Sequence, residues 1–408
     1  MQSIKTRVTV LTSLLAVLAS VASADADVIS DWNKKTVSVG AKAKAGVMQD
    51  RNIAIVHVAM FDAVNAIARR YTPYRVQLTA ELTASPEAAA AAAAHFLLTR
   101  LYPDQTYDVE MLYRTSLATI PDGESKSQGI RLGEKVAAEI FAWRIKDGAD
   151  APNSYRPFTA AGTYIPTMLP IGFSMATTTP FALTHSSQFR PVAPYSLQSA
   201  QWARDYNEVK RIGATKSAIR SKEQSDIARF WEFIGPDIYN PIVRQLGAAK
   251  RLDLTDNARL FALVAIATAD AKFAFYDAKY TYHFWRPVTA IRNGDIDGND
   301  ATERDPTWEP SIVTPLHPEY PCGHCATAAA AAAVLETLFG DTVPTFTLIS
   351  PTVPGMRRSF VRLSDYVAEV INARVYGGMH YRTSGEVGAA MGRRIGEYTV
   401  QNYLKPVR

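Results

Sequence analysis

The sequence predicts an all-α protein, a multi-helix bundle of about ten or more helices. Apolar residues recur at helical spacing along much of the chain, several of these runs start with helix-capping residues, and strand-like alternation is almost absent. With 408 residues, of which 47% are hydrophobic and 20% charged, the chain is long and apolar enough for a substantial core. One large domain or two medium ones would hold these helices.

The first 26 residues are typical of a secretory signal peptide. Lys5 and Arg7 precede an apolar stretch from Val8 to Val21, and small residues follow up to Ala26. About 14 apolar residues are fewer than the roughly 20 that a spanning helix needs, and no later stretch is expected to be long and apolar enough. We expect a cleaved signal at 1–26 and a periplasmic or secreted protein without stable membrane insertion; a retained anchor is the alternative.

Residues 27–200 are expected to form an N-terminal helical region that ends in a proline-rich connection. Helical spacing marks Arg51–Arg70, and Ser85 as N-cap with Pro86 opens an Ala-rich helix. A turn at 121–123 precedes a further helix from Gly129 to Trp143. From 151 to 194, seven prolines predict a long irregular connection over the surface or over a site.

Residues 201–408 are expected to form a C-terminal helical domain that carries the functional site. Its predicted helices begin at capping residues or end at glycines, and they are Ser221–Phe233 with a capping box, Thr255–Tyr280, Cys325–Phe339, and Asp365–Val375 with Ser364 as cap. The last helix carries glycines on one stripe, which allows another helix to approach closely, at Gly385, Gly388, Gly392 and Gly396.

Charge and cysteine content narrow the function. The net charge of +5 is modest and no Lys/Arg run is present, so nucleic-acid binding is not expected, and the basic surplus suits a local anion site. Only Cys322 and Cys325 are present, so packing rather than a disulfide framework must stabilise the fold.

Three short clusters in the last third of the chain could build one oxyanion site. The first is Lys279 with Arg286 and Pro287: seven residues are about 700° of helix rotation, so both cations would face one side of a continuing helix. A solvated helix face is the alternative, but the residues between and beside them are large and apolar.

The other two clusters lie at chain breaks. Pro321-Cys322-Gly323-His324 precedes an Ala-rich helix, whose positive end and free N–H groups would face an anion, with His324 at the mouth or merely as a cap. Arg374 and His380 flank two glycines, so they can converge from the end of one helix and the start of the next. Each cluster alone has a structural explanation; the combination is more specific.

These clusters resemble the three-part signature of the phosphatidic acid phosphatase type 2 and vanadium haloperoxidase superfamily: K-x6-R-P, P-S-G-H and S-R-x5-H-x3-D. Further stretches are similar to its secreted bacterial haloperoxidase-related branch, at 56–65, 187–191, 278–291 and 317–321. The resemblance spans most of the chain after the signal and implies the all-helical fold of that superfamily.

The resemblance also implies roles. Lys279, Arg286, Arg374 and the Gly323 N–H would hold the oxygens of phosphate or vanadate, with Cys322 at a position that donates to an oxygen. His380 would ligate vanadate and His324 would act as acid-base group, in a haloperoxidase that uses hydrogen peroxide and halide. The first alternative is a phosphomonoesterase that forms a phosphohistidine at His380 and needs no vanadate; the second is an oxyanion-binding protein without turnover.

Three departures from the signature bear on activity. Cys322 replaces a serine, and a thiol is a weak donor that peroxide can oxidise. Ser384 replaces the aspartate and could accept from an imidazole N–H without supplying charge, and Ala373 replaces the serine before Arg374. These departures could impair the haloperoxidase activity that the resemblance implies, or leave a site retained only for binding.

The Cys322-Gly323-His324-Cys325 motif allows two further interpretations. Thiol-disulfide exchange would need a thioredoxin-like βαβ context, which the surrounding helical pattern disfavours. A disulfide between Cys322 and Cys325 would rigidify the loop and remove the Cys322 donor. The oligomeric state is open, a homo-oligomer included.

Overall fold

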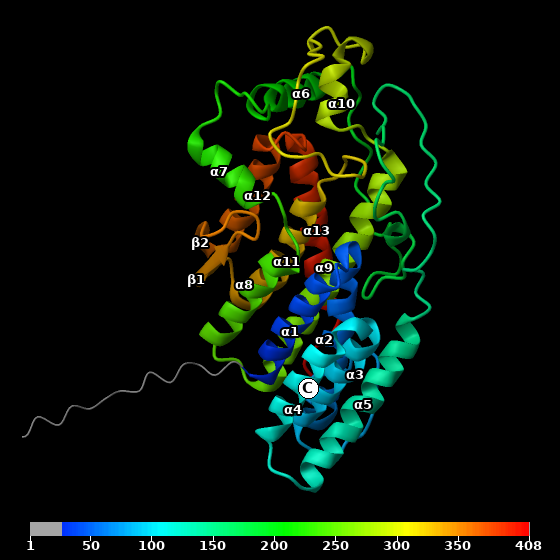
Figure 1. Cartoon of the computed structure of the whole chain (residues 1–408), viewed down its shortest axis with the longest axis vertical. Coiled ribbons are helices and arrows are strands. Elements are labelled where there is room, and N and C mark those ends of the chain that lie inside the picture. The colour runs from blue at the N-terminus through cyan, green and yellow to red at the C-terminus, as the bar shows by residue number, and fades with distance from the viewer. Residues whose placement is uncertain (1–26, 408) are drawn as a thin grey trace, which may run out of the picture.

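The computed structural model describes residues 27–407 and confirms the all-α prediction (Figure 1). The expected signal peptide at 1–26 lies outside the described residues. The described chain contains thirteen α-helices and one antiparallel hairpin of β1 (Thr342–Ile349) and β2 (Arg357–Arg362). The hairpin was not predicted, because Pro344 interrupts the alternation that buries Val343, Phe346 and Leu348.

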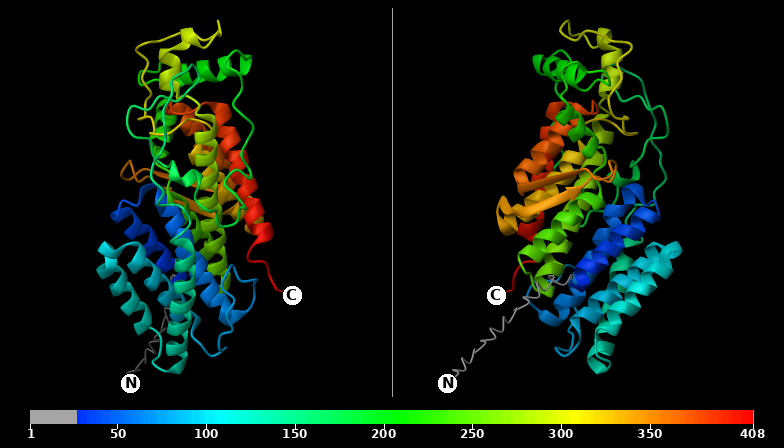
Figure 2. Two further views of the ribbon diagram at one scale, coloured as in Figure 1. Left: turned by 90° about the vertical axis from the view of Figure 1, so that its right-hand side faces the viewer. Right: turned by 60° about the vertical axis from the view of Figure 1, so that its left-hand side comes forward.

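The helices divide along the long axis of the molecule. Those before the proline-rich connection are α1 (Val28–Lys42), α2 (Gln49–Ala68), α3 (Pro86–Leu101), α4 (Thr106–Ala118) and α5 (Glu124–Arg144). Those after it are α6 (Ala200–Ile212), α7 (Lys222–Phe230), α8 (Pro236–Ala249), α9 (Leu254–Tyr282), α10 (Pro287–Arg292), α11 (Gly323–Phe339), α12 (Leu363–Tyr376) and α13 (Arg382–Asn402). Figure 2 shows α3, α4 and α5 at one end and α6 and α10 at the other.

The buried helices α2 and α9 join the helices before the proline-rich connection to those after it. α9 packs against α2 on one side and against α11 and α13 on another. The segment Gly46–Ala68, which includes α2, is long and apolar enough to cross a membrane, contrary to expectation. Because 94% of its most apolar stretch is buried within the fold, it serves here as a core helix.

The predicted glycine stripe of α13 is confirmed as a contact with α11. A Cβ atom on Gly388 would lie 2.4 Å from the carbonyl oxygen of Cys322, and one on Gly392 would lie 2.0 Å from that of Ala326. Both distances are far below van der Waals contact, so only glycine lets the helices approach this closely. The stripe thereby fixes the start of α11, where the second cluster lies.

Helix starts follow the capping residues in part. Ser85 caps α3 and the Ser221 capping box precedes α7, as predicted. Asp253 rather than Thr255 caps α9, because its carboxylate accepts from the Asp256 N–H. Ser364 does not cap α12, since its hydroxyl and N–H donate to Asp341 instead.

The proline-rich connection is irregular, as predicted, with one short 3₁₀ turn at Ser174–Ala176. It is anchored to α9 by the buried carboxylate of Asp270. This carboxylate accepts from the N–H groups of Phe181, Ala182 and Leu183 at 2.6, 2.6 and 2.9 Å. Burial raises the pKa of Asp270 to about 6, against the lowering effect of these hydrogen bonds.

Replacing Asp270 by alanine is expected to lower the free energy of unfolding by roughly 3 kcal/mol or more, since three buried N–H donors would lose their acceptor. Urea unfolding measures this. Asp277→Ala is the matched control, because Asp277 also ties the connection to α9, but through a more exposed pair with Arg190; its cost should stay near 1 kcal/mol or below. Equal losses would contradict the anchoring role of Asp270.

The same variant should show a pH-dependent effect. Because the pKa of Asp270 is raised from 3.8 to about 6 in the native state, the native protein binds its proton more tightly than the unfolded chain. The resulting stabilisation is complete below about pH 4 and is lost as the pH rises through about 6. The difference in unfolding free energy between wild type and Asp270→Ala should therefore be larger near pH 4 than near pH 7; parallel pH profiles would contradict this.

Candidate active site

Three cationic side chains lie fully buried around His380. Lys279 is in the last turn of α9, Arg286 directly precedes α10, and Arg374 is in the last turn of α12; their exposed fractions are 0%, 1% and 0%. Lys279 and Arg286 do not share a helix, contrary to the expectation for a continuing helix. α9 ends at His283, whose left-handed φ of 51° turns the chain, and Arg286 returns beside Lys279 in extended conformation.

Arg286 is the centre of a hydrogen-bond network. Its Nε donates to the carbonyl oxygen of His317 at 2.9 Å, and one terminal nitrogen donates to His317 Nδ1 at 2.9 Å. The other donates to the carbonyl oxygen of Met379 at 2.9 Å and lies 3.1 Å from His380 Nε2. Four of its five donors are thus oriented by contacts with two other chain segments.

Lys279 and Arg374 each retain an N–H donor without a partner in the described chain. Lys279 Nζ donates to the carbonyl oxygens of Pro318 and Glu319 at 2.9 and 2.8 Å, leaving its third hydrogen. Arg374 donates to the carbonyl oxygen of Trp231 at 2.7 Å, but its buried Nε has no partner in the described chain. Burial and Arg286 hold the pKa of Lys279 well below its ordinary value, and burial lowers that of Arg374 to about 10. A bound anion would offset the cost of burying the charges of Lys279 and Arg374.

His380 is oriented by Glu319, not by Ser384. Its Nδ1 lies 2.7 Å from Glu319 Oε1, which also accepts from the Tyr381 N–H at 3.1 Å. The expectation that Ser384 accepts from the imidazole is wrong, since its hydroxyl has no hydrogen-bond partner within residues 27–407. The aspartate missing from the signature thus has a carboxylate counterpart on another segment.

These contacts settle the tautomer of His380. The nitrogen of Arg286 can only donate, so His380 Nε2 must carry a lone pair and Nδ1 the proton that goes to Glu319. Burial, with Arg286, Lys279 and Arg374 nearby, keeps the pKa of His380 well below its ordinary value. A neutral imidazole with a free Nε2 lone pair is the form that can coordinate or attack an electrophilic centre.

Glu319 is unusual as a buried acid. Burial raises its pKa to about 8, although Arg286 and Lys279 lower it. Ser384 also lowers this pKa, so its hydroxyl lies near the carboxyl group, but no hydrogen bond of ordinary geometry joins them, and Glu319 Oε2 is unpartnered in the described part of the chain. The site therefore holds three buried cations against one weakly acidic carboxyl group.

The start of α11 supplies backbone donors. Gly323 and His324 are its first two residues, so their N–H groups have no intrahelical acceptor and point from the positive end of the helix. Cys322 is the N-cap: its Sγ accepts from the Cys325 N–H at 3.4 Å. His324 is half-buried, its Nε2 lies 3.3 Å from the Glu232 carbonyl oxygen, and burial and Arg374 lower its pKa well below the ordinary value.

Both cysteines are buried free thiols, with no disulfide in the described chain. Their Sγ atoms lie 2.8 Å apart. The thioredoxin-like interpretation fails because α11 lies among α9, α12 and α13, and the hairpin β1–β2 follows it instead of framing it.

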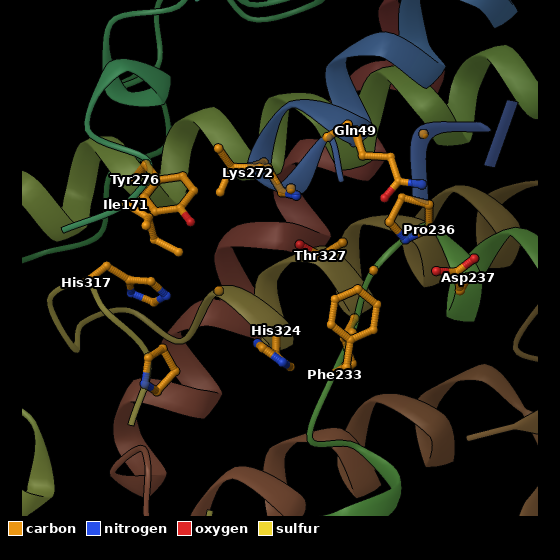
Figure 3. A pocket seen from close by; sticks show the side chains of 18 of the residues that line it. Gln49, Ile171, Phe233, Pro236, Asp237, Lys272, Tyr276, His317, His324 and Thr327 are labelled. Atoms are coloured by element: carbon orange, nitrogen blue, oxygen red, sulfur yellow. The ribbon is translucent and has the colours of Figure 1, made fainter. Parts of the chain in front are cut away.

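A cavity of about 700 Å³ opens onto this site (Figure 3). His317 and Tyr276 lie on one side, Phe233 and Asp237 on the other, with His324 between them. The cavity draws on both halves of the chain, and its lining includes residues 40, 41, 44–47 and 49 at α1 and α2 and between them, Ile171 of the connection, residues 233–237, Lys272, Phe275, Tyr276, His317, Gly323 and His324.

The structure thus brings together all seven residues predicted for the site: Lys279, Arg286, Cys322, Gly323, His324, Arg374 and His380. Sequence analysis missed Glu319, His317 and the lining at 40–49. Two signals were available for the first two: the polar density of Leu316–Tyr320, which an idle loop would not require, and the likeness to the haloperoxidase-related branch at 317–321.

The donor set fits an oxyanion rather than a bare metal cation. Within residues 27–407, no group of three or more His, Cys, Asp or Glu is placed to hold a metal ion. Three buried cations, free N–H groups at a helix start and one imidazole lone pair instead suit phosphate, or vanadate with a single histidine ligand.

Comparison with known proteins agrees with this site. The family model described as the VCPO second helical-bundle domain matches residues 259–408, which include every residue of the predicted site. The vanadium chloroperoxidase of Curvularia inaequalis is 25% identical over 400 residues, which cover 78% of this chain and 65% of that protein. The chain therefore spans about two thirds of the length of this curated relative.

Solved structures extend the likeness to nearly the whole chain. A bacterial vanadium-dependent iodoperoxidase superposes with a TM-score of 0.77 at 26% identity, over 93% of this chain and 98% of that one. A bacterial vanadium-dependent chloroperoxidase has the same fold, with a TM-score of 0.66 at 19% identity over 86% and 90% of the two chains. In its fold, in its matched C-terminal segment and in its likeness to these relatives, the chain is similar to the vanadium haloperoxidase superfamily.

Proposed function

We propose that the protein is a vanadium-dependent haloperoxidase that oxidises halide with hydrogen peroxide. The observation that carries this proposal is the convergence of three fully buried cations on His380, whose Nε2 lone pair faces them. The superfamily relatives named as chloroperoxidase and iodoperoxidase support the same chemistry.

The residues that would hold vanadate are those of the buried network. Lys279, Arg286 and Arg374 would neutralise its oxygens, the Gly323 N–H would donate to one, and His380 Nε2 would ligate the vanadium. Vanadate when bound would supply the Lewis acid that activates peroxide towards halide. Arg286 contacts His380 Nε2 in this structure, so it would have to turn towards the anion on binding.

Two histidines would serve the cavity side of the site. His324 stays neutral because of its lowered pKa, so it can accept a proton from incoming peroxide. His317 accepts from Arg286 at Nδ1, so its Nε2 carries the proton and is a hydrogen-bond donor on the cavity wall.

A paired assay tests the proposal. Purified protein depleted of vanadate should brominate a dye only after vanadate and hydrogen peroxide are added, and should hydrolyse p-nitrophenyl phosphate slowly or not at all. Phosphate should compete with vanadate for the same donors. Two results would overturn the proposal: a bromination rate that does not depend on added vanadate, or no bromination at saturating vanadate.

The phosphomonoesterase alternative has one observation in its favour. The Glu319–His380 pair orients and activates an imidazole as a nucleophile would require. Phosphate-ester hydrolysis without vanadate would then be the main activity, and acid-labile phosphate would label His380. Tight vanadate binding with neither activity would indicate the oxyanion-binding class.

A further inference from the structure

The two thiols at the start of α11 are placed for chemistry that the proposed reaction does not use. Cys322 Sγ and Cys325 Sγ are 2.8 Å apart, closer than van der Waals contact of two sulfur atoms, and both are fully buried. A disulfide needs about 2.05 Å between the sulfurs, so the shift required is below about 1 Å. Side-chain rotation alone could supply it.

The cysteines differ in reactivity because of their surroundings. Burial opposes ionisation of Cys322, but the Cys325 S–H that donates to it, the charge of Arg374 and the Cys325 N–H outweigh burial and lower its pKa below the ordinary value. Burial and the neighbouring Cys322 sulfur raise the pKa of Cys325. Cys322 is therefore the more nucleophilic thiol and Cys325 the partner that would resolve its oxidised form.

The cavity gives a small oxidant access to this pair. Gly323 and His324, the two residues between the cysteines, both line it. The thiols themselves are fully buried beside these lining residues, so hydrogen peroxide has to pass the first turn of α11 to reach them.

We propose that Cys322 and Cys325 form a peroxide-sensitive switch that shuts the oxyanion site by closing a disulfide. The Cys322 thiolate attacks one oxygen of hydrogen peroxide; the O–O bond breaks, the sulfur gains a hydroxyl group as sulfenic acid, and hydroxide leaves. The Cys325 thiol then attacks that sulfur, the S–O bond breaks and water leaves. In sum, two thiols and one hydrogen peroxide give one disulfide and two waters.

Disulfide formation weakens anion binding through Cys322. In the protonated form of Cys322, Sγ accepts from Cys325 and its own hydrogen is available to an oxyanion, whereas the thiolate in equilibrium with this form is the species that reacts with peroxide. In the disulfide this donor no longer exists. Because the effect on turnover rests on the proposed haloperoxidase function, whereas disulfide formation and anion binding do not, the two can be tested separately.

The test exposes the reduced full-length protein to excess hydrogen peroxide without vanadate or halide, and follows intact mass and vanadate affinity by equilibrium dialysis. The mass should fall by two hydrogens, the affinity should weaken about tenfold, and a dithiol should restore both. Cys325→Ser should gain oxygen instead of losing hydrogen, and Cys322→Ser should keep its mass and its vanadate affinity under peroxide.

Three outcomes would overturn the switch: an unchanged mass, a disulfide that leaves vanadate affinity unaltered, or a Cys322→Ser variant that weakens on peroxide treatment like the wild type. The mass and dialysis measurements need no turnover, so absence of bromination would count against the proposed function alone.

Discussion

His380→Ala is expected to abolish halide oxidation and to weaken vanadate binding by more than about a hundredfold. Loss of a residue that merely supports a ligand typically costs 10- to 100-fold, and here the ligand itself would be removed. The substitution also leaves Arg286 and Glu319 without the imidazole that joins them. Equilibrium dialysis of vanadate and the bromination rate measure the two losses.

A matched control separates this effect from a general one. His185 is exposed and lies outside the cavity lining, and among the described residues its imidazole bonds only to Ser187, so His185→Ala should leave both quantities unchanged. Near-UV circular dichroism of both variants would show that the fold is retained. If His380→Ala bound vanadate as tightly as wild type, His380 would not be the ligand.

The residues of the site were largely predictable because they lie in short local sequence patterns. Arg286 and His324 lie beside a proline or a glycine at a helix start, and Arg374 and His380 flank two glycines, so residue type and chain break occur together in the sequence. The glycine stripe of α13 was predictable for the same reason, since four-residue spacing is local. These local patterns predict which residues face the site.

The contacts that tune the site were not predictable, because they join distant segments. Glu319 and His380 are 61 residues apart, and nothing near His380 marks Glu319 as its partner. The cavity lining at 40–49 comes from the opposite end of the chain. The likeness to the family signature even directed attention to position 384, where an aspartate was expected and where Ser384 has no hydrogen-bond partner in the described structure.

Glu319→Ala is expected to lower vanadate affinity and bromination about 10- to 100-fold, although Glu319 would not touch the anion. Without its carboxyl group, His380 Nδ1 loses the acceptor that fixes the tautomer and the ring, so Nε2 no longer presents its lone pair reliably. Glu319→Gln is the conservative comparison, because the amide oxygen can still accept from Nδ1, and it should retain more affinity than alanine.

A relocated carboxylate distinguishes positioning from simple structural support. Ser384 lies near Glu319 at the position where the family signature has aspartate. In the Glu319→Ala background, Ser384→Asp should recover much of the vanadate affinity, because it returns an acceptor to His380 from the first turn of α13. In the wild type the same substitution should instead weaken binding, since two neighbouring buried carboxyl groups would compete for one imidazole and for the cations. A merely structural role of Glu319 would not produce a gain of vanadate affinity in one background and a loss in the other. If Ser384→Asp failed to restore vanadate affinity in the Glu319→Ala background, the positioning role would be contradicted.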